Sequence, residues 1–342
     1  MIENNKPKRS RRMSGAITVK DVAMLAGVAP MTVSRALNTP GQVSPELLKK
    51  VQDAVARTGY VPNRMAGGLA SSRSRLIAAV VPSTVNSVFM ETIESLNGAL
   101  FDAGYQLMLG QSSYSAEREA MLLDEVIGRR PDGIFLTGIL APGPSRTKLL
   151  ASGIPVVETW DLTPTPIDML IGFSHSEIGR AVARFLIAKG RKRFAMVKAG
   201  DERARRRFEA FADTVAHSGL APVVVADVGD ARFLKSGRAA LAELLAQAPD
   251  VDAIFCSSDL LALGVMTEAR VRGIPVPSQI AIVGFGDVPF VADMSPALST
   301  VRINGPDIGR QAAHFLIERA EGRAVAPCIV DVGFSIVERD SS

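Results

Sequence analysis

Two short helices joined by a glycine-containing turn lie near the N-terminus and constrain this chain more than any other feature. Thr18 can cap the first helix, and Gly27 supplies the turn that ends it. The second helix should begin at Pro30, because proline is tolerated at the first helical position. A third helix is expected between Ser44, a capping residue, and Gly59. A helix pair of this kind is the minimal device for placing a helix in the DNA major groove, so the sequence predicts a small all-α DNA-binding head.

Charge is distributed unevenly along the 342 residues. Residues 1–75 contain 13 lysines and arginines against 4 aspartates and glutamates, a net charge of +9, whereas residues 76–342 carry a net charge of −5. A basic head on an acidic body indicates that only the head contacts an anionic polymer. A solvated basic tail would explain part of this charge. The helix pair inside the head favours DNA as its partner.

From Leu76 onward, short apolar runs alternate with helical stretches. Runs such as 76–81 and 253–256 read as buried strands, and stretches such as 177–189 and 260–272 read as helices. This alternation predicts parallel sheets with helices on both faces, and about 265 residues suffice for two such lobes. The expected fold class is therefore α/β, with an all-α helix-turn-helix head followed by a two-lobed core of doubly wound parallel sheets.

The sequence argues against several functional classes. Residues 284–286 carry only a fragment of the dinucleotide-binding fingerprint, and no nucleophile, base or carboxylate pair is arranged for catalysis. The three histidines lack paired ligand spacing, and the two cysteines lie far apart, so we expect no cofactor, no metal and no enzyme activity. No apolar run approaches the roughly 18 residues that span a bilayer, and no signal peptide follows the basic N-terminus. We expect a cytoplasmic protein with no membrane partner.

The N-terminal segment resembles the DNA-binding head of the lactose/galactose repressor family over about 55 residues. The resemblance is carried by Asp21-Val22-Ala23, Ala26-Gly27-Val28, Thr32-Val33-Ser34-Arg35, Asn38, Val43-Ser44, Gly59-Tyr60, Pro62-Asn63, Ala66 and Leu69.

In that family, the residues that open the second helix read bases. Arg35 is the strongest candidate here, because an arginine bidentate to guanine is the commonest specific contact. Pro30 and Met31 offer no side-chain hydrogen bonds, so their contacts with bases would be apolar. The DNA-binding residues implied by the resemblance are Thr18, Pro30, Met31, Thr32, Ser34, Arg35, Asn38, Tyr60, Asn63, Arg64, Ala66 and Leu69.

The segment that follows the head resembles the family hinge, which forms a short helix on DNA. Leu69 matches the leucine that wedges into the minor groove and kinks the duplex. Gly67 and Gly68 each cost roughly 0.5–1 kcal/mol of helix stability relative to alanine. We therefore expect this hinge to be disordered without DNA.

The body resembles the sugar-sensing core of the same family, which is similar to periplasmic binding proteins. In that fold the chain crosses between the lobes three times, here near 161–169, 297–301 and 322–327. The expected organisation is a basic tail (1–16), a helix-turn-helix domain (17–62), a hinge (63–75) and an effector-binding and dimerisation core (76–342), with lobe 1 at about 76–161 and 300–323 and lobe 2 at about 170–297 and 327–338.

The ligand of an open α/β sheet binds at the carboxyl ends of the strands, which in a two-lobed body means the cleft. Arg203 and Arg207, four residues apart, share a helix face and suit a carboxylate or a phosphate, and Trp160 can stack on a sugar chain. The segments around 158–161, 201–204 and 284–287 resemble the gluconate-utilisation repressors of the family. The expected effector contacts are Phe89, Glu158, Trp160, Asp161, Arg203, Arg207, Ser258, Asp259 and Asp287.

These observations predict a homodimeric transcriptional repressor that binds a pseudo-palindromic DNA operator. A sugar acid such as gluconate would act as the inducer and release the DNA. A different sugar or purine effector, a corepressor and an activator remain open, as do a sugar-binding transport protein and a sugar-acid enzyme with a DNA-binding head. The chain lacks a heptad-repeat tail after Val337, which favours a dimer over a tetramer.

Overall fold

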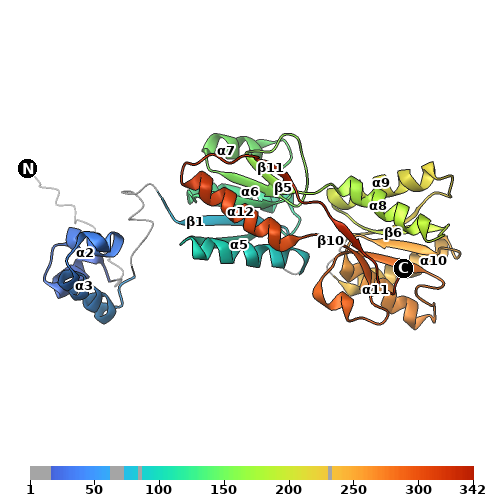
Figure 1. Cartoon of the computed structure of the whole chain (residues 1–342), viewed down its shortest axis with the longest axis horizontal. Coiled ribbons are helices and arrows are strands. Elements are labelled where there is room, and N and C mark those ends of the chain that lie inside the picture. The colour runs from blue at the N-terminus through green and yellow to red at the C-terminus, as the bar shows by residue number, and fades with distance from the viewer. Residues whose placement is uncertain (1–16, 62–72, 84–86, 230–232) are drawn as a thin grey trace, which may run out of the picture. The chain divides into compact units, whose positions relative to one another are not determined.

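The computed structural model describes residues 17–61, 73–83, 87–229 and 233–342 (Figure 1). Its contacts divide the chain into two compact units, residues 1–74 and residues 75–342. We call them the head and the core. Within the described residues, no helix is long and apolar enough to cross a membrane.

The head consists of short helices that begin and end where the sequence predicts. Their bounds are α1 Val19–Ala26, α2 Pro30–Asn38, the 3-10 helix η1 Pro40–Gln42 and α3 Pro45–Thr58. One small apolar cluster holds them together, and its fully buried members are Val22, Ala23, Val33, Ala36, Val51 and Ala54.

Local capping contacts explain these helix ends. The Asp21 carboxylate accepts hydrogen bonds from the backbone N–H and the hydroxyl of Thr18, both at 2.7 Å, at the start of α1. The Ser44 hydroxyl oxygen accepts the backbone N–H of Leu47 at the start of α3. Gly27 and Gly59 end α1 and α3 with φ angles of 66° and 67°, a left-handed conformation that favours glycine.

Lobe 1 of the core contains a parallel sheet with the strand order β11-β5-β4-β3-β1-β2. Its strands are β1 Leu76–Val81, β2 Gln106–Gln111, β3 Gly133–Thr137, β4 Val156–Thr159, β5 Met169–Gly172 and β11 Ile329–Asp331. Its helices are the 3-10 helix η2 Ser87–Phe89, α5 Met90–Asp102, α6 Ala116–Gly128, α7 Pro144–Ser152 and α12 Gly305–Ala320.

Alternate side chains of the lobe 1 strands serve two separate apolar layers. On β1, Ile77 and Ala79 belong to the same buried cluster as residues of α5 and α12, whereas Ala78 and Val80 pack with residues of α6 and α7. Figure 1 shows α5 and α12 side by side along this sheet. The sheet is therefore covered on both faces, which explains why its strands read as continuous apolar runs.

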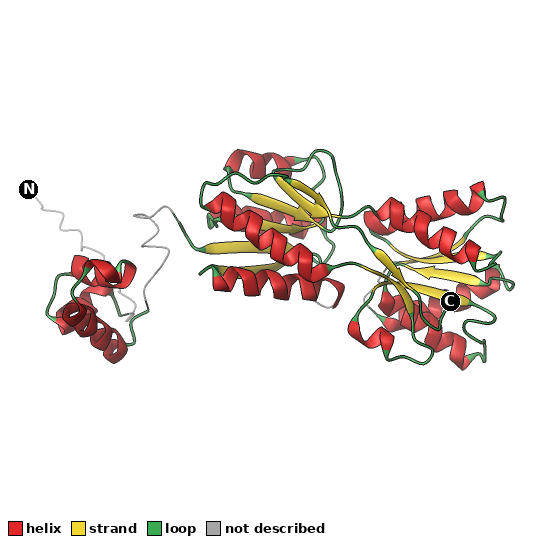
Figure 2. Ribbon diagram, in the orientation of Figure 1, coloured by secondary structure: helices red, strands yellow, loops and turns green. Residues whose placement is uncertain are grey.

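Lobe 2 repeats this architecture with the strand order β12-β10-β9-β8-β6-β7. The pairs are parallel except that β12 runs antiparallel to β10. Figure 2 shows helices on both sides of the strands. The strands are β6 Phe194–Ala199, β7 Val224–Val228, β8 Ala253–Cys256, β9 Ala281–Gly286, β10 Ser299–Arg302 and β12 Ser335–Val337, and the helices are α8 His175–Ala188, α9 Glu202–His217, α10 Leu234–Gln247, α11 Asp259–Val271 and the 3-10 helix η3 Pro289–Ala292.

Strand pairing moves each crossing between the lobes to a later position than the sequence predicts. β5 still pairs with β4, so the first crossing is at 173–174 and not at 161–169. β10 pairs with β9 in lobe 2, which places the second crossing at 303–304. β11 pairs with β5 in lobe 1, so the third crossing is at 332–334.

The expected lobe boundaries at 170, 300 and 327 are therefore wrong by a few residues. Three- and four-residue strands have too little periodicity to be recognised before their partners are known. In the described part of the core, lobe 1 comprises residues 76–172 and 305–331, and lobe 2 comprises residues 175–302 and 335–342.

Candidate functional site

A small pocket lies between the two lobes at the carboxyl ends of the strands, where the sequence places the ligand. Its lobe 1 wall contains Trp160, which directly follows β4, and its lobe 2 wall contains Arg207 of α9. The cavity has a volume of about 40 Å³. We call it the interlobe pocket, and its lining residues are Val88, Phe89, Tyr114, Trp160, His175, Asp201, Arg203, Arg207, Ser257, Ser258 and Phe285.

Arg207 is a buried cation in this pocket, and only 4% of its surface is exposed. One terminal guanidinium nitrogen, Nη1, donates to Nδ1 of His175 at 2.8 Å, and Nη2 donates to the carbonyl of Ser257 at 3.3 Å. The guanidinium carbon lies 4.2 Å from the ring centre of Phe285. Among the described residues, Arg207 forms no ion pair, and its Nε–H has no hydrogen-bond partner. Burial lowers the pKa of Arg207 to about 10.

Arg203 reaches the pocket from one turn earlier on α9. Its guanidinium carbon lies 5.4 Å from the ring centre of Phe89, a lobe 1 residue. Its nearest carboxylate contact is weak, 3.9 Å between Nε and an oxygen of Asp201. That oxygen also accepts the backbone N–H of Ala204 and caps α9. Two arginines therefore face the pocket with little charge compensation from the described residues.

The two arginines between them point elsewhere, as the helical spacing predicts. Arg205 pairs with Glu202 and Glu209 on the exposed face of α9. Nη1 of Arg206 lies 3.1 and 3.2 Å from the two carboxylate oxygens of Asp161, which belongs to lobe 1. This ion pair connects the two lobes beside the pocket.

Aromatic rings form the other wall of the pocket. The ring centres of Phe89 and Trp160 are 4.9 Å apart, and those of Trp160 and Phe173 are 5.6 Å apart, both in edge-to-face geometry. Trp160 is buried, and its indole N–H has no partner among the described residues. An orphaned donor that lines a pocket is available to a ligand.

Three non-glycine residues with positive φ lie around the pocket. The values are 65° for Trp160, 59° for Tyr114 and 54° for Asp287. Trp160 and Tyr114 line the pocket, and Asp287 directly follows β9, the strand that contains the lining residue Phe285. Backbone strain of this kind persists where the surrounding structure enforces it, and it gathers at binding sites.

Two of the expected effector residues are buried supports of lobe 1. The carboxylate oxygens of Glu158 accept the backbone N–H groups of Leu140 and Ile167, at 2.9 and 2.8 Å. Asp161 accepts the backbone N–H of Leu162 in addition to its pair with Arg206. Burial raises the pKa of both carboxyl groups. Both carboxylates are used by the protein itself in this structure, and their contact with an effector stays a prediction.

Two further acidic residues have supporting roles in lobe 2. The carboxylate of Asp259 accepts the hydroxyl of Thr300 at 2.6 Å and the backbone N–H of Val288 at 3.0 Å, and burial raises its pKa to about 6. Asp287 pairs with Arg302 and with Arg339. Neither lines the interlobe pocket, so contact of either residue with an effector also stays a prediction. An acidic residue that follows a strand can bind groups of the protein's own loops as readily as it can bind a ligand.

Of the nine expected contacts, the pocket wall contains Phe89, Trp160, Arg203, Arg207 and Ser258. The sequence prediction omitted Val88, Tyr114, His175, Asp201, Ser257 and Phe285. Asp201 and Ser257 lie in segments that leave strands, so the strand-exit rule could have found them. Nothing in the sequence indicates His175, because its role depends on partners brought together by the fold.

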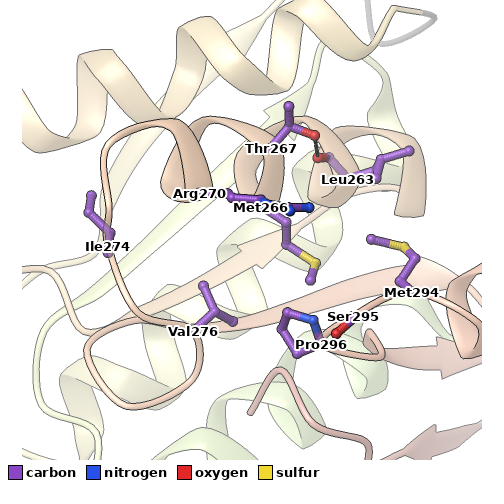
Figure 3. Close-up of a pocket in the computed structure, with 9 residues that line it drawn as sticks. All are labelled: Leu263, Met266, Thr267, Arg270, Ile274, Val276, Met294, Ser295 and Pro296. Carbon is purple, nitrogen blue, oxygen red and sulfur yellow. Dashed lines mark hydrogen bonds between the residues drawn. The ribbon is translucent and has the colours of Figure 1, made fainter.

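A second cavity, of about 440 Å³, lies entirely in lobe 2 (Figure 3). It is formed by α11 and by the segments that precede β9 and β10, and hence lies at the amino ends of these strands. Arg270 is its one charged lining residue within the described part of the chain. The lining residues are Leu263, Met266, Thr267, Arg270, Ile274, Val276, Met294, Ser295 and Pro296. Although it is larger, it lacks converging polar groups and lies opposite the usual ligand edge of an α/β sheet.

The head presents α2 as its candidate DNA-reading surface. Arg35 and Met31 are exposed, Met31 to 73%, and Pro30 and Asn38 are exposed at its two ends. Thr32 and Ser34 are half-buried, and Ser34 accepts a hydrogen bond from the side-chain amide of Asn38. Thr18 caps α1, and Tyr60 packs against the apolar cluster of the head. The predicted DNA contacts Asn63, Arg64, Ala66 and Leu69 lie outside the described residues.

Comparison with known proteins agrees with both parts of this architecture. Residues 18–63 match the family described as bacterial regulatory proteins, lacI family, and residues 183–342 match a periplasmic binding protein-like domain. The HTH-type transcriptional regulator GntR of Pseudomonas aeruginosa is 36% identical over 339 residues, which cover 98% of this chain and 99% of that protein. The chain belongs to the LacI family. This membership makes it a DNA-binding transcriptional repressor and not an enzyme.

Two further LacI-family relatives show the extent of the similarity. The regulator GntR of Escherichia coli is 32% identical, with 93% of this chain and 96% of that protein covered. The crystal structure of a LacI-family transcriptional regulator from Silicibacter pomeroyi has a TM-score of 0.89 and 33% identity, and covers 95% of this chain and 99% of that chain. Members of the family bind operator DNA and sugar effectors. No cluster of metal-ligating side chains occurs among the residues described in this LacI-family chain.

Proposed function

We propose that this repressor binds a pseudo-palindromic operator as a homodimer and is released by a sugar-acid inducer, gluconate or a close derivative. The observation that carries the proposal is Arg207, a buried guanidinium without an ionic partner among the described residues, in the wall of the interlobe pocket. A buried charge is costly unless it is paired, so this site favours a ligand that supplies the missing anion.

The chemistry of the pocket narrows the class of that anion. The planar guanidinium groups of Arg203 and Arg207 match the two oxygens of a carboxylate. The indole N–H of Trp160 is a further free donor for an acceptor oxygen. A sugar acid combines one carboxylate with several hydroxyl oxygens and therefore uses all three groups. The resemblance to the gluconate-utilisation repressors supports the same class, as do the relatives named GntR, which match 98% and 93% of this chain.

The size of the pocket couples binding to movement of the core. A cavity of about 40 Å³ is close to the space of a single water molecule, and a six-carbon acid requires far more. The acid therefore enters only when the lobes or their side chains rearrange. An inducer acts through its different affinity for two arrangements, with a coupling of typically 1–3 kcal/mol. Contacts such as Asp161–Arg206 are the ones that such a rearrangement would change.

The proposed dimer has a candidate surface on lobe 1. β2 is the last strand in the order of its sheet, and α5 and α6 contact it. These three elements carry exposed apolar side chains: Leu109 is 43% exposed, Phe101 69% and Met121 70%. A second copy of the chain would remove this surface from water and make the DNA site two-fold symmetric.

Release of the operator is the test of the proposed inducer. The full-length protein bound to labelled operator DNA is titrated with gluconate, its phosphorylated and keto forms, glucose and ribose. We expect release by a sugar acid and none by neutral sugars, and we expect the variant Arg207→Met to lose the response. Arg205→Met, on the exposed face of the same helix, is the matched control. An operator complex that withstands every acid contradicts the inducer, and a complex that an acid strengthens would indicate a corepressor.

Fluorescence of Trp160, the single tryptophan of the chain, provides a test that needs no DNA. Because Trp160 lines the pocket, a bound acid should change its emission in a saturable manner. A response to neutral sugars alone would contradict the role given to Arg203 and Arg207.

A further inference from the structure

One of the contacts of the Arg207 guanidinium is the imidazole ring of His175. His175 is the first residue of α8 and directly follows the first crossing between the lobes. Its Nδ1 is 2.8 Å from Nη1 of Arg207, and its Nε2 is 2.9 Å from the carbonyl oxygen of Trp160. Arg207 lies in lobe 2 and Trp160 in lobe 1. His175 therefore connects the buried cation of the pocket with the opposite wall.

These two contacts determine which nitrogen of the ring carries the proton. A carbonyl oxygen only accepts hydrogen bonds, so Nε2 must donate to Trp160. A guanidinium only donates, so Nδ1 must accept from Arg207. The two requirements are compatible in one form of the side chain, the neutral imidazole with its proton on Nε2. An imidazolium would place an N–H against a guanidinium N–H.

The charges around His175 also favour this neutral form. The charges of Arg207, Arg203 and Arg206 of α9 all disfavour an imidazolium, and the rings of Phe173 and Phe285 lie 4.9 and 6.3 Å from its ring centre. Burial, followed by Arg207, holds the pKa of His175 well below its usual value. The ring is buried, with 3% of the residue exposed. It remains an acceptor for Arg207 throughout the neutral pH range.

We propose that His175 is a positioning residue which, as the neutral Nε2–H tautomer, aims the Arg207 guanidinium at the carboxylate of the effector. The inference rests on the proposed function for the identity of the ligand. It adds that selection of an acid over a neutral polyol depends on the acceptor at Nδ1. The carbonyl of Trp160 keeps the ring proton on Nε2 of His175, which leaves Nδ1 able to accept from Arg207. Both lobes therefore contribute to the orientation of Arg207.

Three substitutions of His175 test the roles of Nδ1 and Nε2 separately. His175→Asn places an amide oxygen at the position of Nδ1 and can still accept from Arg207. His175→Gln places its amide at the position of Nε2 and can still donate to Trp160, but it leaves Arg207 without this acceptor. His175→Phe keeps the ring shape and removes both contacts.

Calorimetric titration of the full-length variants with gluconate and with glucitol, its neutral polyol counterpart, measures the role in charge selection. We expect His175→Asn to bind gluconate within about threefold of the wild type, and His175→Gln and His175→Phe to bind it about tenfold more weakly. Glucitol binding should be equal in all four proteins. Gluconate affinity that is unchanged in His175→Gln and His175→Phe, or an equal loss for both ligands, would overturn the positioning role.

A second measurement does not depend on the ligand, so failure of the proposed function can be distinguished from failure of this inference. The chain has three histidines, so nitrogen NMR of histidine-labelled protein, with His175→Asn for assignment, resolves the tautomer. We expect a neutral His175 with its proton on Nε2 from about pH 8 to about pH 6, whereas Arg207→Met should shift the Nδ1 signal. A proton on Nδ1, or an imidazolium near pH 7, would refute the inference whichever sugar the protein binds.

Discussion

Replacement of Arg207 by methionine should leave the stability of the protein nearly unchanged but strongly weaken ligand binding. Arg207 is 4% exposed, and among the described residues it has no carboxylate partner. Breaking an ordinary buried ion pair costs about 3–5 kcal/mol, because the remaining partner stays buried and charged. Removing a buried charge that has no such partner leaves nothing charged behind. The substitution should therefore be well tolerated by the effector-free protein.

The expected change in the free energy of unfolding follows from the contacts of the Arg207 guanidinium. The difference between the usual pKa of 12.5 and about 10 corresponds to about 3 kcal/mol of unfavourable burial, which Arg207→Met relieves. Against this, the variant loses the contact with the Phe285 ring, about 0.5–2 kcal/mol. It also leaves Nδ1 of His175 and the carbonyl of Ser257 unpaired, at about 1 kcal/mol each. The sum predicts a free energy of unfolding within about 1 kcal/mol of the wild type.

Denaturant unfolding of the core and calorimetric titration with gluconate measure the two quantities. A hydrogen bond to a charged group contributes about 1.5–3 kcal/mol, so the affinity for the acid should fall roughly 10- to 150-fold. Arg205→Met removes an exposed arginine from the same helix and should leave the affinity unchanged. If Arg207→Met loses 3 kcal/mol or more of stability, the guanidinium is already compensated in the free protein. The argument for an anionic ligand would then fail.

Three other predictions concern different parts of the molecule. Burial raises the pKa of Asp259 to about 6 from 3.8, so the contribution of Asp259 to the free energy of unfolding is most favourable below about pH 4. This contribution declines by about 3 kcal/mol as the pH rises through 6. Asp259→Asn should remove the decline, and equal pH profiles of unfolding for the two proteins would contradict the prediction. Arg35→Ala should weaken operator binding by about 1–3 kcal/mol at fixed salt, measured by fluorescence anisotropy. A loss confined to one base position would indicate base reading, a uniform loss with a smaller salt dependence would indicate a phosphate contact, and no loss would exclude both. Asp161→Asn removes the negative charge of the pair with Arg206 that connects the lobes in the arrangement too small for the acid, so gluconate affinity should rise about two- to fivefold while its preference over glucitol persists. An unchanged or lower affinity would show that this pair does not stabilise the excluding arrangement.

The head is the part that the sequence alone predicts most completely. Pro30 begins α2, Ser44 caps α3, and Gly27 and Gly59 end helices, all as expected. These signals act within a single turn, so residues close in sequence contain the information. The strands 76–81 and 253–256 were also predictable, because each is an apolar run that is buried on both faces.

The short strands and the crossings between the lobes required the tertiary structure. β5 has four residues and β11 has three. β11 is a strand only because it pairs with β5, more than 150 residues away, and β5 lies between β4 and β11 in the sheet. The sequence therefore placed the crossings too early. The same limit applies to Glu158, near the end of β4, and to Asp259, shortly after β8. Their positions are those of ligand-binding residues, but in this structure their carboxylates accept backbone N–H groups of the protein.

Within the candidate site, the sequence determined which arginines share a face of α9, since helical spacing alone places Arg203 with Arg207 and apart from Arg205. It could not determine that Arg207 has no carboxylate partner among the described residues or that His175 accepts from it. Those facts depend on burial and on side chains that converge from α8, α9 and the end of β4. The type of charge at the site is thus a property of the sequence. The fold determines how strongly this charge acts, because only the fold removes the water that would otherwise solvate the guanidinium. The fold also determines where the guanidinium points.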